Sequence, residues 1–277
     1  MCLLSIVRSA ALQPKKPKPK RNLRKYFNLA VAAVGLSLAA QGISYAADLH
    51  LPQNSKAAEN VTVSERSSSV WTSLENGRDY LRGTYYAEKD EKATLSNIFN
   101  RDLRETRSAW TSRDWQRTID RHNRQMKYNA ADRALVVDWA QSLEDLRGKT
   151  VLEQLCEVDR RVDNFLIYDS DKNVYGKNDY FATPAESLKN GYGDCDDFAI
   201  MKYFSLYYLG VPDADMRFTA VTMKWDKTAG HAVVVNAEDG NYVLDNRSPA
   251  GFVQKDDYHT WEYRTVSAMN ASKVWRA

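Results

Sequence analysis

Residues 191–209 hold the side chains whose types and spacing could carry out covalent chemistry. A Gly-Tyr-Gly-Asp sequence leads directly into Cys195, and a nearly continuous apolar run follows it. Asp194 is a good helix N-cap, so Cys195 is expected in the first turn of a buried central helix. Backbone N–H groups and the helix dipole favour a thiolate at that position. The stretch therefore predicts nucleophilic attack by a thiol.

Three carboxylates surround this cysteine, at Asp194, Asp196 and Asp197. Negative charge beside a thiol raises its pKa and so opposes the helix dipole. A positive group is needed to offset these charges. It could be a protonated histidine or a divalent cation that prefers oxygen ligands. The motif predicts a base near Cys195 and raises the question of a metal site.

His231 is the candidate base because it lies at the start of a predicted strand, where its side chain can face a cleft. The next predicted strand ends at Asp245, which could orient the imidazole and stabilise its charged form. Asn246 is the alternative orienting residue. A three-residue hairpin loop, 238–240, would place Asp245 opposite Val233 and on the same face as His231, whereas a two-residue turn would place it on the other face. The triad hypothesis therefore predicts the longer loop.

A cysteine on a helix, with a histidine and an aspartate on adjacent strands, is the arrangement for acyl transfer through a thioester. His231 would take the thiol proton, and its imidazolium would later protonate the leaving amine. The backbone N–H of Cys195 is the first candidate oxyanion donor. Two alternatives stay open at this point. An amine could accept the acyl group in place of water, or Cys195 could form a disulfide with Cys156 in a non-catalytic binding module.

The elements that position these residues come in the order helices first, strands second. Helical spacing of apolar residues, capping sequences and a Gly stop at Gly210 define the helices, and alternating or Val-rich runs define the strands. The predicted helices cover 131–147, 151–165, 183–189 and 194–209, and the predicted strands cover 217–223, 231–236 and 242–244. This order predicts an α+β class in which an antiparallel sheet follows the helices.

Residues 1–46 have the composition of a secretory signal peptide. They contain eight Lys or Arg and no Asp or Glu, and an apolar run at 27–40 leads to an Ala-x-Ala-like site at 44–46. Cleavage is expected after Ala46. The alternative is an uncleaved anchor, but the run is shorter than the roughly 20 residues that span a bilayer. Removing these eight from the 39 Lys and Arg leaves 31 against 36 Asp and Glu, a charge of −5. The basic charge of the whole chain is therefore no sign of nucleic-acid binding.

The chain divides into three predicted regions. Residues 1–46 are the signal peptide, 47–130 are a polar and charged arm and extension, and 131–277 form the domain that carries the candidate site. His122 lies among charged residues of the extension and is expected on the surface.

Several motifs together resemble the bacterial transglutaminase-like cysteine proteinases, the LapG-type periplasmic proteases. They are the segment 169–184, which contains Asn-Val-Tyr-Gly-Lys-Asn-Asp-Tyr-Phe-Ala-Thr-Pro at 173–184, then Gly-Tyr-Gly-Asp-Cys-Asp-Asp-Phe-Ala at 191–199, Gly-His-Ala at 230–232 and Leu-Asp-Asn at 244–246. The resemblance covers residues 139–245. It implies a papain-like or transglutaminase-like protease fold with Cys195, His231 and Asp245 as a triad.

The resemblance also implies a cofactor, a substrate and a partner. Members of the family depend on Ca²⁺, which maps onto Asp194 and Asp196, with Asp197 as a further candidate ligand. Asp196 stands where the family usually has Glu, so its carboxylate is one methylene shorter. The family clips the N-terminal region of a large surface adhesin, and the periplasmic domain of an inner-membrane cyclic di-GMP receptor holds the protease and so controls biofilm release. We therefore expect a calcium-dependent periplasmic endopeptidase.

Overall fold

The computed structural model describes residues 95–107, 110–237 and 239–277. The predicted signal peptide and most of the predicted arm, residues 1–94, lie outside these residues. Within the described part of the chain, no helix combines the length and apolar character needed to cross a membrane.

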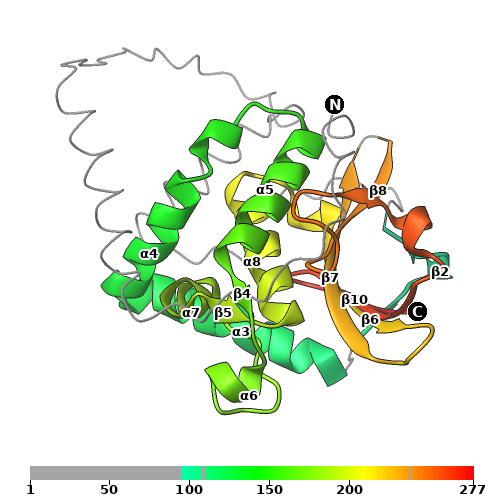
Figure 1. Cartoon of the computed structure of the whole chain (residues 1–277), viewed down its shortest axis with the longest axis horizontal. Helices are drawn as coiled ribbons and strands as arrows, with labels where there is room; N and C mark the ends of the chain where they lie inside the picture. Colours follow the sequence, from blue (N-terminus) through cyan, green and yellow to red (C-terminus); the bar gives the residue numbers. More distant parts are fainter. Residues whose placement is uncertain (1–94, 108–109, 238) are drawn as a thin grey trace, which may run out of the picture. The chain divides into compact units, whose positions relative to one another are not determined.

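A layer of helices packs against one face of a seven-stranded antiparallel sheet (Figure 1). The strand order is β3-β11-β10-β6-β7-β8-β9, and every neighbouring pair is antiparallel. The strands of this sheet are β3 (Arg104–Thr106), β6 (Met216–Met223), β7 (Ala229–Ala237), β8 (Gly240–Leu244), β9 (Gln254–Lys255), β10 (Tyr263–Met269) and β11 (Val274–Arg276). The predicted α+β class is confirmed.

The helices and the remaining short elements precede most of the sheet in the sequence. The α-helices are α3 (Trp110–Tyr128), α4 (Ala130–Gln141), α5 (Val151–Phe165), α6 (Asp171–Val174), α7 (Pro184–Asn190) and α8 (Cys195–Tyr208). Two small two-stranded sheets pair β1 (Asn97–Ile98) with β2 (Arg101–Asp102) and β4 (Ile167–Tyr168) with β5 (Tyr192–Gly193). Turns of 3-10 helix occupy Glu144–Leu146, Asp213–Asp215 and Asp256–His259.

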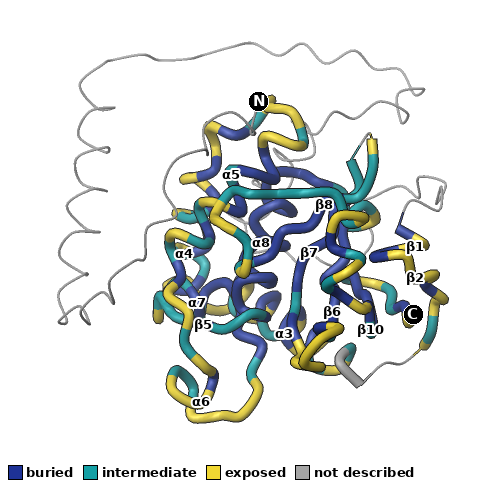
Figure 2. The backbone as a smooth tube through the Cα atoms, turned by 45° about the vertical axis from the view of Figure 1, so that its right-hand side comes forward, coloured by how far each residue is buried: buried dark blue, intermediate teal, exposed yellow. Residues whose placement is uncertain are grey.

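Helix α8 is the centre of the fold, as its apolar sequence predicts. Every residue from Asp196 to Tyr208 is buried, and Figure 2 shows the helix enclosed by other elements. It packs against α5 on one side and against β7 on the other. A helix that is covered all round has no polar stripe, which explains its apolar composition. Each fully buried large apolar side chain contributes about 1.5–3 kcal/mol of transfer free energy. Burial of the helix therefore holds the residues of its first turn, Cys195 among them, in a fixed position.

The two faces of the sheet belong to two different apolar clusters. Phe218 and Val233 pack toward the helices, whereas Val221 and Val234 pack on the opposite side with Ile98. Alternation along each strand explains the division, because successive side chains point to opposite faces. This alternation later decides which side chains can reach the cysteine.

Most predicted helices are confirmed, but the first one is shorter than its apolar spacing suggests. Helix α4 ends at Gln141, and a 3-10 turn follows at Glu144–Leu146. The Ser142 hydroxyl donates to the Trp139 carbonyl, and the Leu143 N–H bonds the Ala140 carbonyl three residues back. A side chain that competes for the backbone and a tighter hydrogen-bond spacing both end an α-helix.

Helix α3 joins the core although its sequence is strongly charged. Trp115, Ile119 and Met126 lie in the same apolar cluster as α8. His122 lies on this inner face and is only 1% exposed, with its ring edge-on to Phe204 at 4.4 Å. The predicted surface position of His122 is therefore wrong, because the inner face of the helix, and not its charged sequence neighbours, determines its burial.

Candidate active site

Two glycines bring the chain to the first turn of α8. Gly191 ends α7 with φ 69°, a left-handed conformation that glycine adopts without strain. Gly193 lies against Asp197, and a Cβ atom on it would come within 2.5 Å of the Asp197 side chain. Both glycines are therefore required for the turn that makes Cys195 the first residue of α8, as the sequence predicts.

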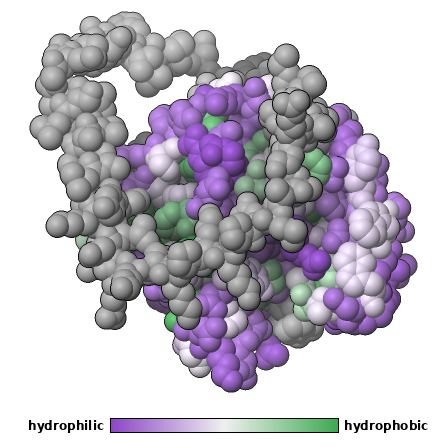
Figure 3. Space-filling model, in the orientation of Figure 1, coloured by the Kyte–Doolittle hydropathy of each residue, from purple (hydrophilic) through white to green (hydrophobic). Residues whose placement is uncertain are grey.

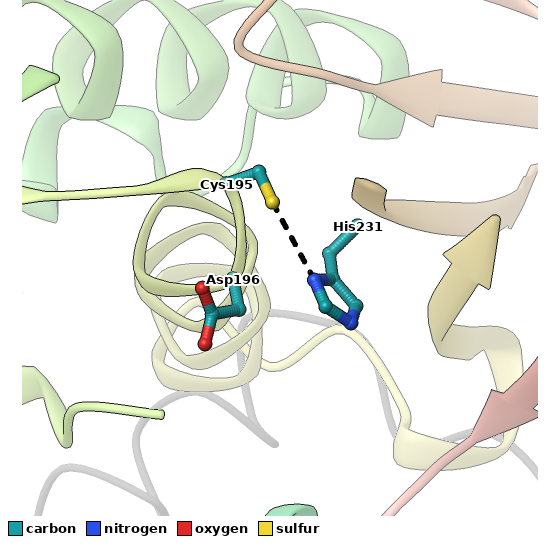
Figure 4. Close-up of side chains that lie close together, drawn as sticks. All are labelled: Cys195, Asp196 and His231. Carbon is teal, nitrogen blue, oxygen red and sulfur yellow. Dashed lines mark hydrogen bonds between the residues drawn. The ribbon is translucent and has the colours of Figure 1, made fainter. Parts of the chain in front are cut away.

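Cys195 and His231 meet across the gap between α8 and β7. The Sγ atom of Cys195 lies 3.5 Å from Nδ1 of His231, and Figure 4 shows the thiol and the ring pointing toward each other. Phe218 stacks on the imidazole at 5.1 Å and Phe181 meets it edge-on at 5.2 Å. These rings fix the plane of the imidazole beside the sulfur.

Burial and nearby carboxylates favour the neutral forms of this pair. Burial raises the pKa of the Cys195 thiol strongly, and the charges of Asp196 and Asp194 raise it further. Burial also lowers the pKa of His231 to about 4, against the opposing effect of the Asp194 charge. A thiol that must act as a nucleophile in this setting requires a nearby positive charge, as the sequence indicates.

The predicted register of the hairpin is wrong. In the structure Val233 pairs with Leu244 and Ala237 pairs with Gly240. Continuation of this register would place Asp245 opposite Ala232, on the face of the sheet away from His231. Neither the three-residue nor the two-residue loop considered for the sequence gives this pairing.

Asp245 nevertheless lies at the same cleft, with its carboxylate held by other groups. One oxygen accepts the Arg247 N–H at 2.9 Å, and the other accepts the Tyr263 hydroxyl. Asp245 is buried and lines the pocket with Cys195 and His231. Its role as the third member of a triad stays a prediction from the resemblance.

Asn246, the alternative orienting residue, lies in the same pocket. Its side-chain oxygen is buried and has no hydrogen-bond partner among the residues that the structure describes. A buried acceptor without a donor is costly unless another group satisfies it. Asn246 therefore keeps an oxygen available to accept a hydrogen bond from the ring of His231, whereas both oxygens of Asp245 are already engaged.

A cluster of carboxylates lies beside the cysteine, and part of it comes from outside the motif. Asp171, Asp194 and Asp197 offer oxygens within 4.8 Å of one another, and so do Asp171, Asp179 and Asp196. The cluster thus includes all three predicted ligands. Asp171 and Asp179 were not predicted, although both lie within the segment 169–184 that carries the resemblance.

Backbone hydrogen bonds fix two of these side chains. The Tyr180 N–H donates to one oxygen of Asp171 at 2.6 Å, and the Ala182 N–H donates to one oxygen of Asp197 at 2.8 Å. The loop after α6 is thereby tied to α8. Its residue Phe181 is in turn held by the Thr118 hydroxyl of α3, which donates to the Phe181 carbonyl at 2.9 Å.

Four oxygens of this cluster have no donor within the described part of the chain. One oxygen each of Asp171, Asp194, Asp196 and Asp197 is buried without a hydrogen-bond partner. Burial, reinforced by neighbouring carboxylates, raises the pKa of Asp196 well above its usual range and that of Asp197 to about 8. It raises the pKa of Asp171 to about 6. Converging, unsatisfied carboxylate oxygens fit a hard cation with oxygen ligands, such as Ca²⁺.

The thiol and the imidazole open onto a cleft of about 790 Å³. Its walls come from α5, the start of α8, the β6–β7 hairpin and the segment after β8. The lining includes Asp163, Tyr168, Phe198, Met223, Thr228 and Arg247. The volume lies in the upper part of the range typical of ligand sites and suits several residues of an extended chain.

The disulfide alternative is contradicted by the structure. Cys156 and Cys195 are not joined by a disulfide; Cys156 is buried and Cys195 is half-buried. A half-buried thiol beside an imidazole at the N-terminus of a helix defines a class of protein, the enzymes that transfer acyl groups through a thioester.

The comparisons with known proteins agree with this class. The family model described as bacterial transglutaminase-like cysteine proteinase matches residues 136–277, which is more than half of the chain. The chain therefore belongs to the bacterial transglutaminase-like cysteine proteinase family. No curated protein sequence is a significant match.

Solved structures of LapG from Legionella pneumophila are also similar to the chain. The calcium-bound form has 26% sequence identity and a TM-score of 0.45, and the match covers 58% of this chain and 87% of that one. The EGTA-treated form has the same identity and TM-score, with 58% and 85% covered.

Proposed function

We propose that the protein is an exported, calcium-dependent cysteine endopeptidase that cleaves the N-terminal region of a large cell-surface adhesin. The observation that carries the protease assignment is the 3.5 Å contact between Cys195 and His231 at the wall of a cleft, within a domain of a cysteine proteinase family. Cleavage of such an adhesin would release it from the surface and control adhesion and biofilm release.

His231 takes the thiol proton of Cys195 through Nδ1, and the thiolate attacks the scissile carbonyl. The imidazolium then protonates the leaving amine, and water hydrolyses the thioester. The backbone N–H of Cys195, in the first turn of α8 where the helix itself offers no acceptor, stabilises the oxyanion. Phe181 and Phe218 keep the ring oriented during these steps.

Asp171, Asp194, Asp196 and Asp197 would hold the Ca²⁺, and the exposed Asp179 would complete the set. The bound cation offsets negative charge beside the thiol and so favours the thiolate. The shorter Asp196 is accommodated because Asp171, the first residue of α6, supplies a further carboxylate.

Residues 1–46 direct export, so the enzyme acts in the periplasm. There the periplasmic domain of an inner-membrane cyclic di-GMP receptor holds the protease and controls its access to the adhesin. The composition of residues 1–46 supports export, and the family resemblance supports the receptor as partner.

The test uses protein purified after export and the N-terminal fragment of a large surface adhesin encoded by the same genome. We expect cleavage at one bond in Ca²⁺, no cleavage in a calcium chelator, and no cleavage by Cys195→Ala. Cleavage that continues in the chelator would contradict the dependence on calcium. Incorporation of a dansylated amine into the fragment, without hydrolysis, would instead indicate a transglutaminase-type acyltransferase.

A further inference from the structure

Two tryptophans lie on the surface beside the catalytic cleft. Trp225 is 50% exposed and Trp261 is 67% exposed, and their rings pack against each other at 5.5 Å with an interplanar angle of 35°. Trp115 and Trp275, in contrast, are buried in the core. Neighbouring exposed tryptophans leave a large apolar area in water, which is typical of an interaction site.

The two rings come from loops that are fastened together. Trp225 lies in the turn between β6 and β7, and Trp261 lies between the 3-10 turn Asp256–His259 and β10. The Lys224 N–H donates to the Glu262 carbonyl at 2.9 Å, and the Lys224 ammonium donates to the Thr260 carbonyl. The pair is therefore held on a fixed platform, which reduces the conformational entropy lost on binding.

This platform is continuous with the wall of the cleft. Met223 and Thr228, which flank the Trp225 turn, line the catalytic pocket, and so does Arg247. The Arg247 guanidinium lies 6.0 Å from the Trp225 ring and 3.8 Å from the Glu262 carboxylate. A chain that leaves the cleft past Arg247 would cross the indole rings next. On the face that Figure 3 displays, outside the grey atoms, hydrophilic colour predominates, with smaller green areas among it.

We propose that Trp225 and Trp261 form an exosite that binds an apolar side chain of the protein substrate, outside the residues that flank the scissile bond. The proposal rests on the proposed protease function and adds a determinant of its specificity. Indole faces bind aliphatic, aromatic and proline side chains through dispersion and area burial. Arg247 would direct the backbone of the chain from the cleft toward the rings.

The experiment profiles cleavage of a proteome-derived peptide library by the full-length exported protein in Ca²⁺, with mass spectrometry of the products. We expect the wild-type cleavage sites to be enriched in apolar residues at one fixed position beyond the residues next to the bond. Trp225→Ala and Trp261→Ala should remove this enrichment and leave the preference next to the bond intact. For a peptide carrying the apolar residue, kcat/KM should fall about tenfold through KM.

Two controls separate recognition from folding. Tyr128→Ala removes another exposed aromatic, at the end of α3, and should leave the profile unchanged. Trp225→Phe keeps an aromatic face and should retain most of the enrichment. Equal thermal unfolding temperatures of all variants establish that each is folded.

The outcomes that overturn the proposal differ from those that overturn the protease function. If Trp225→Ala and Trp261→Ala leave the cleavage profile unchanged, the exosite proposal is contradicted and the protease function is not. If the two variants lose binding to the receptor domain, or lose self-association, while their cleavage profile is unchanged, the rings bind that partner and not the substrate. A wild-type protein that cuts neither the library peptides nor the adhesin fragment would contradict both proposals.

Discussion

The sulfur of Cys195 and Nδ1 of His231 lie 3.5 Å apart although 36 positions separate the two residues in the sequence. Cys195 begins α8 and His231 lies near the start of β7, and these two elements pack directly against each other in the core. A nucleophile and a base on rigid, buried elements need little reorganisation before reaction.

Substitution of either residue should therefore abolish turnover without unfolding the protein. We expect His231→Ala to lower kcat by about 10²–10⁴-fold, the usual contribution of general acid–base catalysis, and Cys195→Ala to remove detectable cleavage. Cys156→Ala is the matched thiol control, because Cys156 is buried on α5, outside the cleft lining. Cleavage kinetics of one peptide with all three variants make the comparison. Normal turnover by His231→Ala would exclude it as the base.

The residue that orients His231 can be identified by a pair of variants. Because Tyr263 and Arg247 engage the Asp245 carboxylate, we expect Asp245→Asn to act mainly on stability, by about 1.5–3 kcal/mol for a hydrogen bond to a charged group. Asn246→Ala should lower kcat about tenfold or more and change stability less. Chemical denaturation and kcat are measured on both. The reverse pattern would establish Asp245 as the third member of the triad.

Calcium should stabilise the fold through the carboxylate cluster. At about 100 times the dissociation constant, a ligand that binds the native state alone adds about 2.7 kcal/mol, which corresponds to a rise in unfolding temperature of roughly 5–10 °C for a domain of this size. Asp171→Asn should greatly reduce this rise, and Asp138→Asn, an exposed carboxylate on α4, should not. An equal rise in both variants would place the cation elsewhere.

Acid should destabilise the protein through His122. Burial lowers the pKa of His122 to about 3 from its usual 6.5, so below pH 6.5 the unfolded chain binds a proton that the folded chain does not. Stability from this residue is complete above pH 6.5 and falls by up to about 1.4 kcal/mol per pH unit toward pH 3. His122→Phe should remove this slope. Denaturation midpoints from pH 7 to pH 4 measure the difference, and parallel curves would contradict it.

A buried ion pair should also be sensitive to substitution. Lys202 is fully buried in α8, with its ammonium 2.6 Å from Asp159 and 2.8 Å from Asp163 on α5. Asp159 also accepts the Gly251 N–H, from the segment that follows Asn246. Lys202→Met leaves carboxylates without their counter-charge and should cost about 3–5 kcal/mol.

Lys149 is exposed, so Lys149→Met is the control for this variant and should change the free energy of unfolding little. Chemical denaturation of both proteins is the measurement. A cost for Lys202→Met below about 1 kcal/mol would show that the pair contributes little.

The sequence alone predicted the parts of the site that depend on local chemistry. A Gly-x-Gly-Asp turn before Cys195 and a long apolar run after it define the start of a buried helix, whatever surrounds them. The start of α7 was predicted in the same way, from the local capping box that Thr183 and Glu186 form. His231 was identified because it is a titratable residue at the edge of a Val-rich strand.

The parts that depend on pairing and on distant segments were missed. The register of β7 with β8 differs from both predicted registers, because a Glu-Asp-Gly sequence permits several turns and the core selects one of them. Asp171 joins the carboxylate cluster from the start of α6, 24 positions before Cys195, and the Tyr180 N–H fixes its carboxylate. For His122, a usable signal existed: Thr118, Ile119 and Met126 lie on the same helical face.

The central claim is that His231 and a cation held by the carboxylate cluster activate Cys195. Its most direct test is the rate at which iodoacetamide alkylates Cys195, followed by peptide mass spectrometry, with the buried Cys156 as an internal reference. We predict that Ca²⁺ accelerates alkylation of Cys195 at least about tenfold, that His231→Ala and Asp171→Asn each remove the acceleration, and that Cys156 reacts slowly throughout. A rate at Cys195 that neither Ca²⁺ nor either substitution changes would contradict the account.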